Sequence, residues 1–206
     1  MSREKLRIAV FASGSGSNFQ ALAEAAKAGA LGPAEIALLV CDKPEAKVIS
    51  RARELGIETF VFRPKEYGSR EAYETVITAE LASRGIGLIV LAGYMRILTD
   101  VLVGAYEGRM INVHPSLLPA FPGIRAIEQA LDYGVKVTGI TVHFVDGGLD
   151  SGPIIAQRVI ELETGDTAET LAARIHAVEH ELLPRTVRLI AEGRVSLAGR
   201  IVTVDG

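Results

Sequence analysis

The sequence predicts an α/β fold, in which an open twisted sheet carries helices on both faces. Short apolar segments typical of strands alternate with helix-like segments through residues 6–113, a pattern that indicates parallel strands joined by helices. Later in the chain, two strand-like segments lie close enough to pair as an antiparallel hairpin. We therefore expect a Rossmann-like open sheet that is mostly parallel, with an antiparallel C-terminal portion.

The first half of the chain contains four predicted strands, each followed by a helix. The strands are expected at residues 6–12, 35–40, 58–62 and 87–92. The helices are expected at residues 19–28, 46–55, 69–82 and 99–105. Glycine ends the first three helices, at Gly29, Gly56 and Gly85, because it readily adopts the left-handed conformation. Residues 87–92 are apolar on both faces, which is typical of a central parallel strand.

The second half of the chain predicts a different arrangement. A fifth strand is expected at residues 110–113, a helix at 126–133, and the hairpin strands at 137–144 and 154–160. A long helix from residue 167 to about residue 192 follows, and Asp166 with Glu169 resembles a capping box in which Asp166 is the cap. Pro184 should kink or split this helix. Residues 196–204 are a weak strand or tail, and because no linker is visible we expect one domain, residues 1–206.

Composition excludes several classes of protein. Of the 206 residues 49% are hydrophobic, and 22 basic residues nearly balance 25 acidic ones, so binding of nucleic acid through phosphate neutralisation is not expected. The single cysteine, Cys41, rules out an internal disulfide and a CxxC metal site, and we expect it to be buried. No apolar run is long enough to cross a bilayer, and residues 6–12 lack the cleavage pattern of a signal peptide. We expect a cytoplasmic protein.

Asn112 and His114 are the first candidates for a chemical role. They interrupt the apolar fifth strand at positions i and i+2, which alternation along a strand sends to the same side. Pro115 and Pro119 then bracket a short rigid loop. An amide beside an imidazole at a strand end suits proton transfer or stabilisation of an oxyanion, whereas a hydrogen-bonded structural histidine is the ordinary alternative.

Residues 14–18, Gly-Ser-Gly-Ser-Asn, join the first strand to the first helix. This arrangement directs backbone N–H groups and a helix N-terminus at an anion. The third glycine of a dinucleotide fingerprint would fall at Phe19, and the Gly-Lys-Ser/Thr of a P-loop is absent. A single phosphate monoester fits the turn, and an ordinary strand–helix connection is the alternative.

Two other segments are candidates for ligand contacts. Residues 94–98, Tyr-Met-Arg-Ile-Leu, follow the fourth strand, where open α/β sheets bind ligands, and they could line a slot for a flat aromatic ligand or pack as a buried loop. Asp150 lies in a glycine-rich loop and is either a turn residue or a carboxylate that, if close to His114, would favour the imidazolium. Asp146, at the other end of the loop, is the competing carboxylate.

Four motifs in a characteristic order resemble those of a known family, and they occur at residues 14–18, 92–98, 112–119 and 141–153. Together they resemble the phosphoribosylglycinamide formyltransferase family, the folate-dependent enzymes of purine synthesis, over nearly the whole chain. Close versions of the Asn-x-His motif occur in methionyl-tRNA formyltransferase and formyltetrahydrofolate hydrolase. We expect neither, because the first would need an RNA-binding extension and the second usually carries an N-terminal regulatory domain. A catalytically idle phosphometabolite-binding module is disfavoured by the intact Asn112, His114 and Asp150.

The resemblance implies roles for the matching positions. The catalytic residues of the family match Asn112, His114 and Asp150. The phosphate-binding loop for glycinamide ribonucleotide matches Gly16, Ser17 and Asn18, and a further substrate-binding residue matches Glu179. Folate contacts are implied for Arg70, Met95, Arg96, Ile97, Leu98 and Asn112. His176 and Ile127 depart from the pattern, since relatives carry Gln and His there.

The implied reaction needs these residue types. The substrate amine attacks the formyl carbon of the co-substrate, 10-formyltetrahydrofolate, and an oxyanion develops. Asn112 can donate from its amide, and a protonated His114 donates more strongly because it is charged. The departing folate nitrogen then gains a proton, a task that suits histidine, and no metal or redox cofactor is required. The expected partners are therefore two small molecules, glycinamide ribonucleotide and a reduced folate, bound by a monomer or homodimer.

Overall fold

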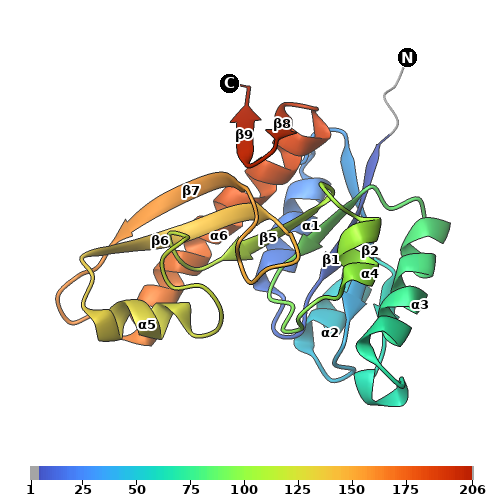
Figure 1. Ribbon diagram of the computed structural model, residues 1–206, viewed down its shortest axis with the longest axis horizontal. Coiled ribbons are helices and arrows are strands. Elements are labelled where there is room, and N and C mark those ends of the chain that lie inside the picture. Colours follow the sequence, from blue (N-terminus) through green and yellow to red (C-terminus); the bar gives the residue numbers. More distant parts are fainter. Residues whose placement is uncertain (1–4, 206) are drawn as a thin grey trace.

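A computed structural model describes residues 5–205 and shows a seven-stranded sheet (Figure 1). The predicted domain bounds also include residues 1–4 and 206, which lie outside the described residues. The strand order is β3-β2-β1-β4-β5-β6-β7. These strands span β1 Leu6–Phe11, β2 Ala34–Cys41, β3 Thr59–Val61, β4 Leu88–Leu91, β5 Met110–His114, β6 Val137–Phe144 and β7 Ile154–Glu161.

The predicted mixture of parallel and antiparallel pairing is confirmed. Strands β1 to β5 pair in parallel, whereas β6 runs antiparallel to both β5 and β7. β2 and β3 lie on one side of β1, and β4 and β5 lie on the other, so the strand order reverses between β1 and β4. Open α/β sheets bind ligands at such a reversal, beyond the carboxyl ends of the strands. The 14–18 turn and the 94–98 segment both lie at this edge.

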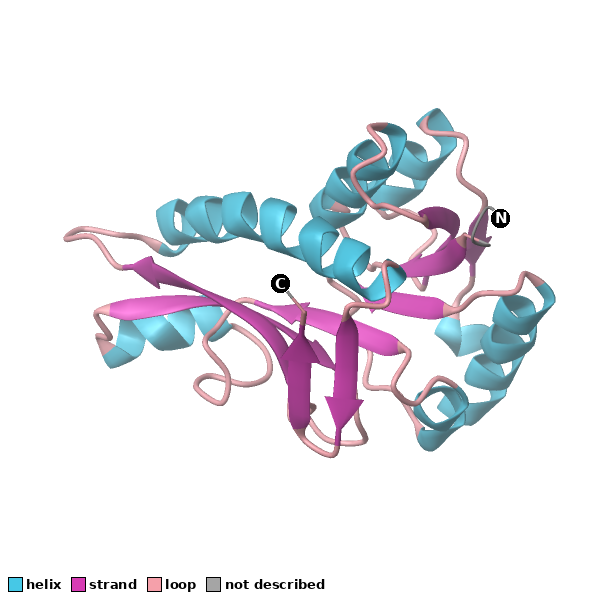
Figure 2. Cartoon of the chain, turned by 90° about the horizontal axis from the view of Figure 1, so that it is seen from above, coloured by secondary structure: helices cyan, strands magenta, loops and turns pink. Residues whose placement is uncertain are grey.

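Helices cover both faces of the sheet, as Figures 1 and 2 show. The helices span α1 Ser17–Lys27, α2 Lys47–Glu54, α3 Arg70–Ser83, α4 Asp100–Ala105, α5 Ala126–Tyr133 and α6 Ala168–Ala191, with a short 3-10 turn, η1, at Pro64–Glu66. One core cluster packs α1, α2 and α6 against strand residues such as Val10, and the other packs α3 and α4 against their neighbours such as Phe11. Because successive side chains of β1 point to opposite faces of the sheet, this strand contributes to both hydrophobic cores. The predicted burial of Cys41 is confirmed.

Two expectations about the start of the long C-terminal helix require correction. The cap of α6 is Thr167, not Asp166, and its capping box is completed by Thr170, not Glu169. Asp166 instead accepts hydrogen bonds from Glu163 N and Thr170 Oγ1, because it lies one residue too early to cap the helix. Of the two outcomes expected at Pro184, a kink or a split, the split is excluded, because α6 is continuous from residue 168 to residue 191.

The end of the chain is a separate hairpin, more ordered than a weak strand or tail. β8 Val195–Ala198 pairs antiparallel with β9 Ile201–Val204, and the two form their own small sheet. Within residues 5–205, no helix is long and apolar enough to cross a membrane.

Candidate active site

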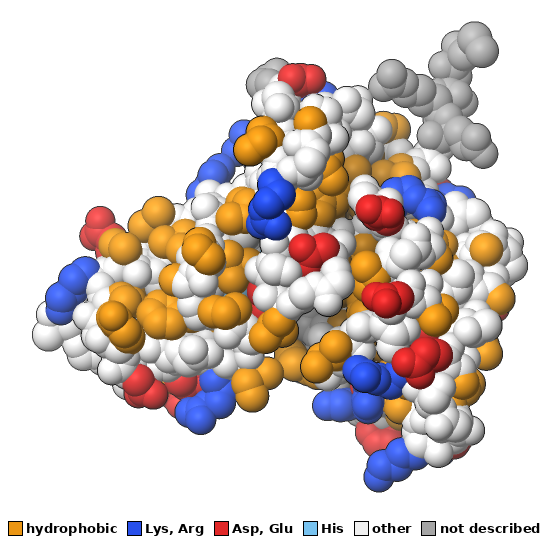
Figure 3. All heavy atoms as spheres, viewed as in Figure 1, with side chains coloured by type: hydrophobic (Ala, Val, Ile, Leu, Met, Phe, Trp, Pro, Cys, Tyr) orange, Lys and Arg blue, Asp and Glu red, His pale blue; other side chains and the backbone are white. Residues whose placement is uncertain are grey.

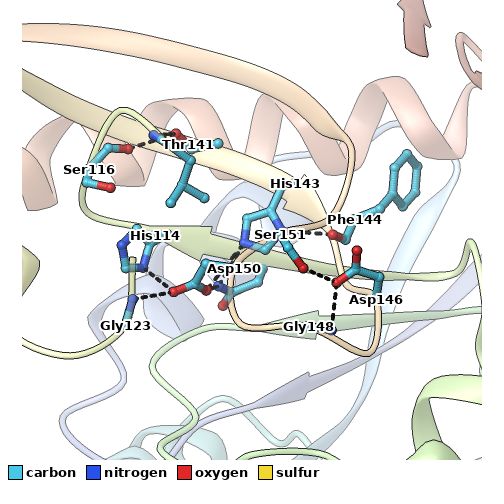
Figure 4. Close-up of polar contacts among 12 residues, drawn as sticks. His114, Ser116, Gly123, Thr141, His143, Phe144, Asp146, Gly148, Asp150 and Ser151 are labelled. Atoms are coloured by element: carbon cyan, nitrogen blue, oxygen red, sulfur yellow. Dashed lines mark hydrogen bonds and ion pairs between the residues drawn. The ribbon is translucent and has the colours of Figure 1, made fainter. Parts of the chain in front are cut away.

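Asn112 and His114 lie side by side, as alternation along the strand predicted. Both belong to β5, and both reach the carboxylate of Asp150. Figure 4 shows His114 pointing toward Asp150. Asn112 Nδ2 lies 3.4 Å from Asp150 Oδ1, and His114 Nδ1 lies 3.4 Å from Asp150 Oδ2. The strand and the loop between β6 and β7 therefore bring an amide, an imidazole and a carboxylate together.

The ring of His114 is buried and is held at both nitrogens. Its Nε2 lies 2.8 Å from the carbonyl oxygen of Phe121, and because a carbonyl only accepts, Nε2 carries a proton. Its Nδ1 faces Asp150. The side chain is 6% exposed, so few solvent molecules compete for these partners. This geometry leaves Nδ1 as the nitrogen that can gain or lose a proton beside a carboxylate.

Asp150 is held ionised by its surroundings. Burial alone would raise the pKa of its carboxyl group, but contacts with His143, Gly123 N and His114 outweigh burial and hold that pKa below its usual value. The Gly123 amide donates to Oδ2 at 2.7 Å. The backbone of Asp150 has φ = +49°, a region that residues other than glycine rarely adopt, and functional sites often contain such positions.

The competing carboxylate, Asp146, stabilises the turn of the loop between β6 and β7. Its Oδ1 accepts hydrogen bonds from Gly148 N at 3.0 Å and Ser151 Oγ at 2.7 Å, which tie the turn together. A Cβ atom at Gly152 would lie 1.8 Å from the carbonyl oxygen of Phe144, so only glycine fits where the loop meets β6. Of the two carboxylates, Asp150 is the one that lies beside His114.

His143 is a member of this cluster to which the sequence assigned no role. Its Nδ1 donates to the Phe144 carbonyl at 2.8 Å, so in the neutral ring Nε2 accepts from Asn112 Nδ2, 3.2 Å away. The Nε2 atom also lies 3.7 Å from Asp150 Oδ1. Antiparallel pairing of β6 with β5 sets His143 opposite Asn112, and this register is the signal that would have identified it.

The 14–18 turn lies beside the predicted substrate-binding glutamate. Asn18 Nδ2 donates to Glu179 Oε2 at 2.9 Å, although the two residues are 161 positions apart, and Glu179 is buried. His176 Nδ1 lies 2.9 Å from the same oxygen. Gly16 has φ = +74°, and a Cβ atom there would lie 2.3 Å from a methyl group of Val48, so α2 packs directly beneath the turn. The backbone of the turn at Gly16 is therefore packed directly against α2.

The 94–98 segment is partly packed and partly exposed, because Tyr94 and Leu98 pack against the hydrophobic core whereas the apolar side chains between them lie in solvent. Met95 and Ile97 are 69% and 72% exposed. Arg96 instead pairs with Asp42, and Arg70, the first residue of α3, is exposed. Figure 3, in the view of Figure 1, shows a hollow near the centre of the molecular surface, bordered in part by hydrophobic side chains. Ile127, which departs from the family pattern, packs partly buried against the hydrophobic core.

Comparison with known proteins identifies the class of enzyme. The family model described as formyl transferase matches residues 6–187, and the chain belongs to this family. The chain is 53% identical over 182 residues to the phosphoribosylglycinamide formyltransferase of Bacillus subtilis (strain 168), covering 88% of this chain and 93% of that protein. It is also 42% identical over 203 residues to the trifunctional purine biosynthetic protein adenosine-3 of Bos taurus, of which it spans 20%.

Solved structures agree with this assignment. The glycinamide ribonucleotide transformylase 1 of Symbiobacterium toebii matches with a TM-score of 0.95 and 43% identity, covering 98% of this chain and 95% of that one. The same enzyme from Geobacillus kaustophilus matches with a TM-score of 0.89 and 56% identity, covering 91% and 99%. The chain is therefore a formyltransferase on a Rossmann-like fold.

Proposed function

We propose that this formyltransferase transfers the formyl group of 10-formyltetrahydrofolate to the amine of glycinamide ribonucleotide, in de novo purine biosynthesis. The observation that carries the proposal is the contact of Asn112, His114 and Asp150 at the end of β5. The names of the similar proteins support the choice of substrate. The chain acts as a single cytoplasmic domain, a monomer or homodimer, on small molecules and without metal.

The site suits direct attack by the amine. The amine nitrogen bonds to the formyl carbon, and the former carbonyl oxygen becomes an oxyanion. One N–H of Asn112 donates to His143, and the other is only 3.4 Å from Asp150, so it can donate to the oxyanion instead. The Nδ1–H of protonated His114 can do the same, because its distance to Asp150 is also 3.4 Å. The bond from the formyl carbon to N10 of the folate then breaks. The proton lost by the amine reaches N10 through His114 or a water beside it, so the products are the formamide and tetrahydrofolate.

The two ligands bind different segments at the carboxyl ends of the parallel strands. The ribonucleotide phosphate binds the backbone N–H groups of Gly16, Ser17 and Asn18 at the N-terminus of α1, where the helix dipole favours an anion. Glu179 contacts the rest of the same substrate. The folate binds against Met95, Arg96, Ile97 and Leu98, with Arg70 and Asn112 as further contacts.

A crystal structure with the ribonucleotide and a stable folate analogue, combined with an absorbance assay for folate turnover, tests the proposal. We expect the phosphate at the 14–18 turn, the folate at the 94–98 segment and formation of the formylated ribonucleotide. Binding of both ligands without turnover would indicate a binding module instead. A phosphate anchored at another place would refute the assignment of the turn.

A further inference from the structure

A buried carboxylate, Asp42, connects the residue before the 14–18 turn to the 94–98 segment. Asp42 follows β2, and 1% of its side chain is exposed. Its Oδ1 accepts a hydrogen bond from Ser13 Oγ at 2.6 Å, and its Oδ2 accepts one from Arg96 Nε at 2.7 Å. Ser13 immediately precedes the 14–18 turn, and Arg96 is the centre of the 94–98 segment. One carboxylate therefore links the ends of β1, β2 and β4.

Through Ser13, Asp42 is also connected to the backbone of the 94–98 segment. Because the Ser13 hydroxyl gives its proton to Asp42, its oxygen is left to accept, and it does so from Met95 N at 2.9 Å. The Ser13 amide in turn donates to the Gly93 carbonyl at 3.1 Å. Asp42 thus holds the segment at a backbone amide, through Ser13, and directly at the side chain of Arg96.

The other end of the segment is held by a second buried carboxylate. Glu74 of α3 is fully buried and accepts hydrogen bonds from Thr99 N and Thr99 Oγ1, and from Leu102 N. Between these two anchors, Met95 and Ile97 keep their apolar side chains largely in solvent. A backbone fixed at both ends prevents these side chains from collapsing onto the protein, and such preorganisation lowers the cost of binding a ligand.

We propose that Asp42 is a positioning residue, which holds the 94–98 segment through Ser13 and Arg96 in the conformation that binds the co-substrate. This inference rests on the proposed function, because it takes that co-substrate to be a reduced folate. Asp42 acts on binding and not on bond making, because β1 and β4 separate β2 from β5. At about 4.8 Å per strand, Asp42 lies roughly 14 Å from His114.

The test is Asp42→Asn, which removes the ion pair with Arg96 but keeps an acceptor for Ser13. We measure the Kd of a stable reduced-folate analogue by calorimetry, hydrogen exchange of the Met95 amide, and steady-state kinetics. The analogue's Kd should rise about tenfold, as expected when a charge-assisted hydrogen bond that fixes the site is lost. Exchange at Met95 should accelerate, while kcat at saturating folate stays within about threefold.

Glu45→Gln is the matched control. Glu45 lines the same cavity of about 460 Å³ as Asp42 and Arg96 and carries the same charge. Among residues 5–205 its one ion-pair partner is the exposed Arg63, at 3.4 Å. Its Kd for the analogue should stay within about twofold, since exposed ion pairs contribute little. An unchanged Kd in a folded Asp42→Asn protein, or an equal rise in Glu45→Gln, would overturn the inference.

Two further measurements keep the test decisive. If Asp42→Asn does not fold, Ser13→Ala replaces it, because it removes the link to Met95 and retains both charges; an unchanged Kd there overturns the inference equally. If the unmodified protein binds neither the analogue nor the ribonucleotide, the proposed function fails. Met95 exchange in Asp42→Asn then still reports on positioning, and an unchanged rate would contradict the inference.

Discussion

Asp150 combines an unusual backbone conformation with four polar partners. Its φ is left-handed, and Gly123 N, Asn112, His114 and His143 surround its carboxylate at the end of β5. A carboxylate in this position can orient the imidazole and order a water that carries the proton. A covalent role is unnecessary, because the substrate amine is already a good nucleophile. We therefore interpret Asp150 as a tuning and orienting residue.

Asp150→Asn should lower kcat by about 10² to 10⁴-fold, the usual cost of losing a positioned acid–base function. Asn in this position keeps the size of the side chain but loses the charge that orients the His114 ring, so the loss should appear in kcat. Affinity for the ribonucleotide should be largely kept. The measurement is kcat and KM across a pH series. Asp146→Asn is the control and should do far less; near-normal turnover in Asp150→Asn with loss of activity in Asp146→Asn would reverse the assignment.

His143→Phe should lower kcat by about tenfold to a hundredfold, because Asn112 loses the acceptor that orients its amide toward the oxyanion. The KM for each substrate should change less than kcat, since the amide acts mainly in the transition state. His143→Gln restores an acceptor and should recover part of the rate. Equal rates for the Phe variant and the unmodified enzyme would show that the contact between His143 and Asn112 has no part in the reaction.

The segment after β4 is short, exposed and anchored by buried groups, so single substitutions on its outer surface should affect binding without unfolding. Ile97→Asp should weaken folate binding by at least about tenfold, because a carboxylate replaces apolar contact area in the ligand slot. Ribonucleotide binding should change little. Titration of each ligand by calorimetry distinguishes the two. Equal losses for both ligands in a folded protein would contradict the folate assignment.

The stability that the His176–Glu179 pair gives to α6 should depend on pH. The hydrogen bond to Glu179 raises the pKa of His176 above its usual value, although partial burial opposes the shift. The stability from this pair is fully present below the ordinary histidine pKa of about 6.5 and is lost as pH rises through the raised folded-state pKa. Because the His176 side chain is 51% exposed, the contribution should be below about 1 kcal/mol.

Urea unfolding of the unmodified protein and of His176→Gln measures this contribution. The difference in free energy of unfolding should be larger at pH 5.5 than at pH 8.5, since Gln keeps a hydrogen bond to Glu179 but never a charge. A difference that grows as pH rises would have the wrong sign for the ion pair.

The C-terminal hairpin connects a distant part of the molecule to the loop that carries Asp150. Arg200, in the turn between β8 and β9, donates to the carbonyl oxygen of Ser151 at 2.8 Å, one residue beyond Asp150. Arg200→Ala should accelerate hydrogen exchange across residues 146–152, while kcat falls by no more than about threefold, because one exposed hydrogen bond contributes about 1 kcal/mol or less. Ile201→Ser alters the same hairpin without touching this contact and serves as control. Unchanged exchange in Arg200→Ala would show that the hairpin does not restrain the loop.

Much of the architecture was predictable from local pattern. Alternating strands and helices predicted the sheet, and Gly29, Gly56 and Gly85 marked helix ends because each adopts positive φ there. The capping box of α6 was misplaced because Asp166 and Thr167 are both good caps, and only the observed backbone shows which residue has the extended conformation of a cap.

The composition of the site was also contained in the sequence, since Asn112, His114 and Asp150 stand in motifs that can be read directly. Their assembly was not, because it depends on strand order and loop closure. His143 meets Asn112 through antiparallel pairing, Glu179 meets Asn18 across 161 positions, and Asp42 joins Ser13 and Arg96 only because β2, β1 and β4 are neighbours. Helix ends and strand alternation are local properties of a few residues, whereas these contacts exist only once the whole sheet has formed.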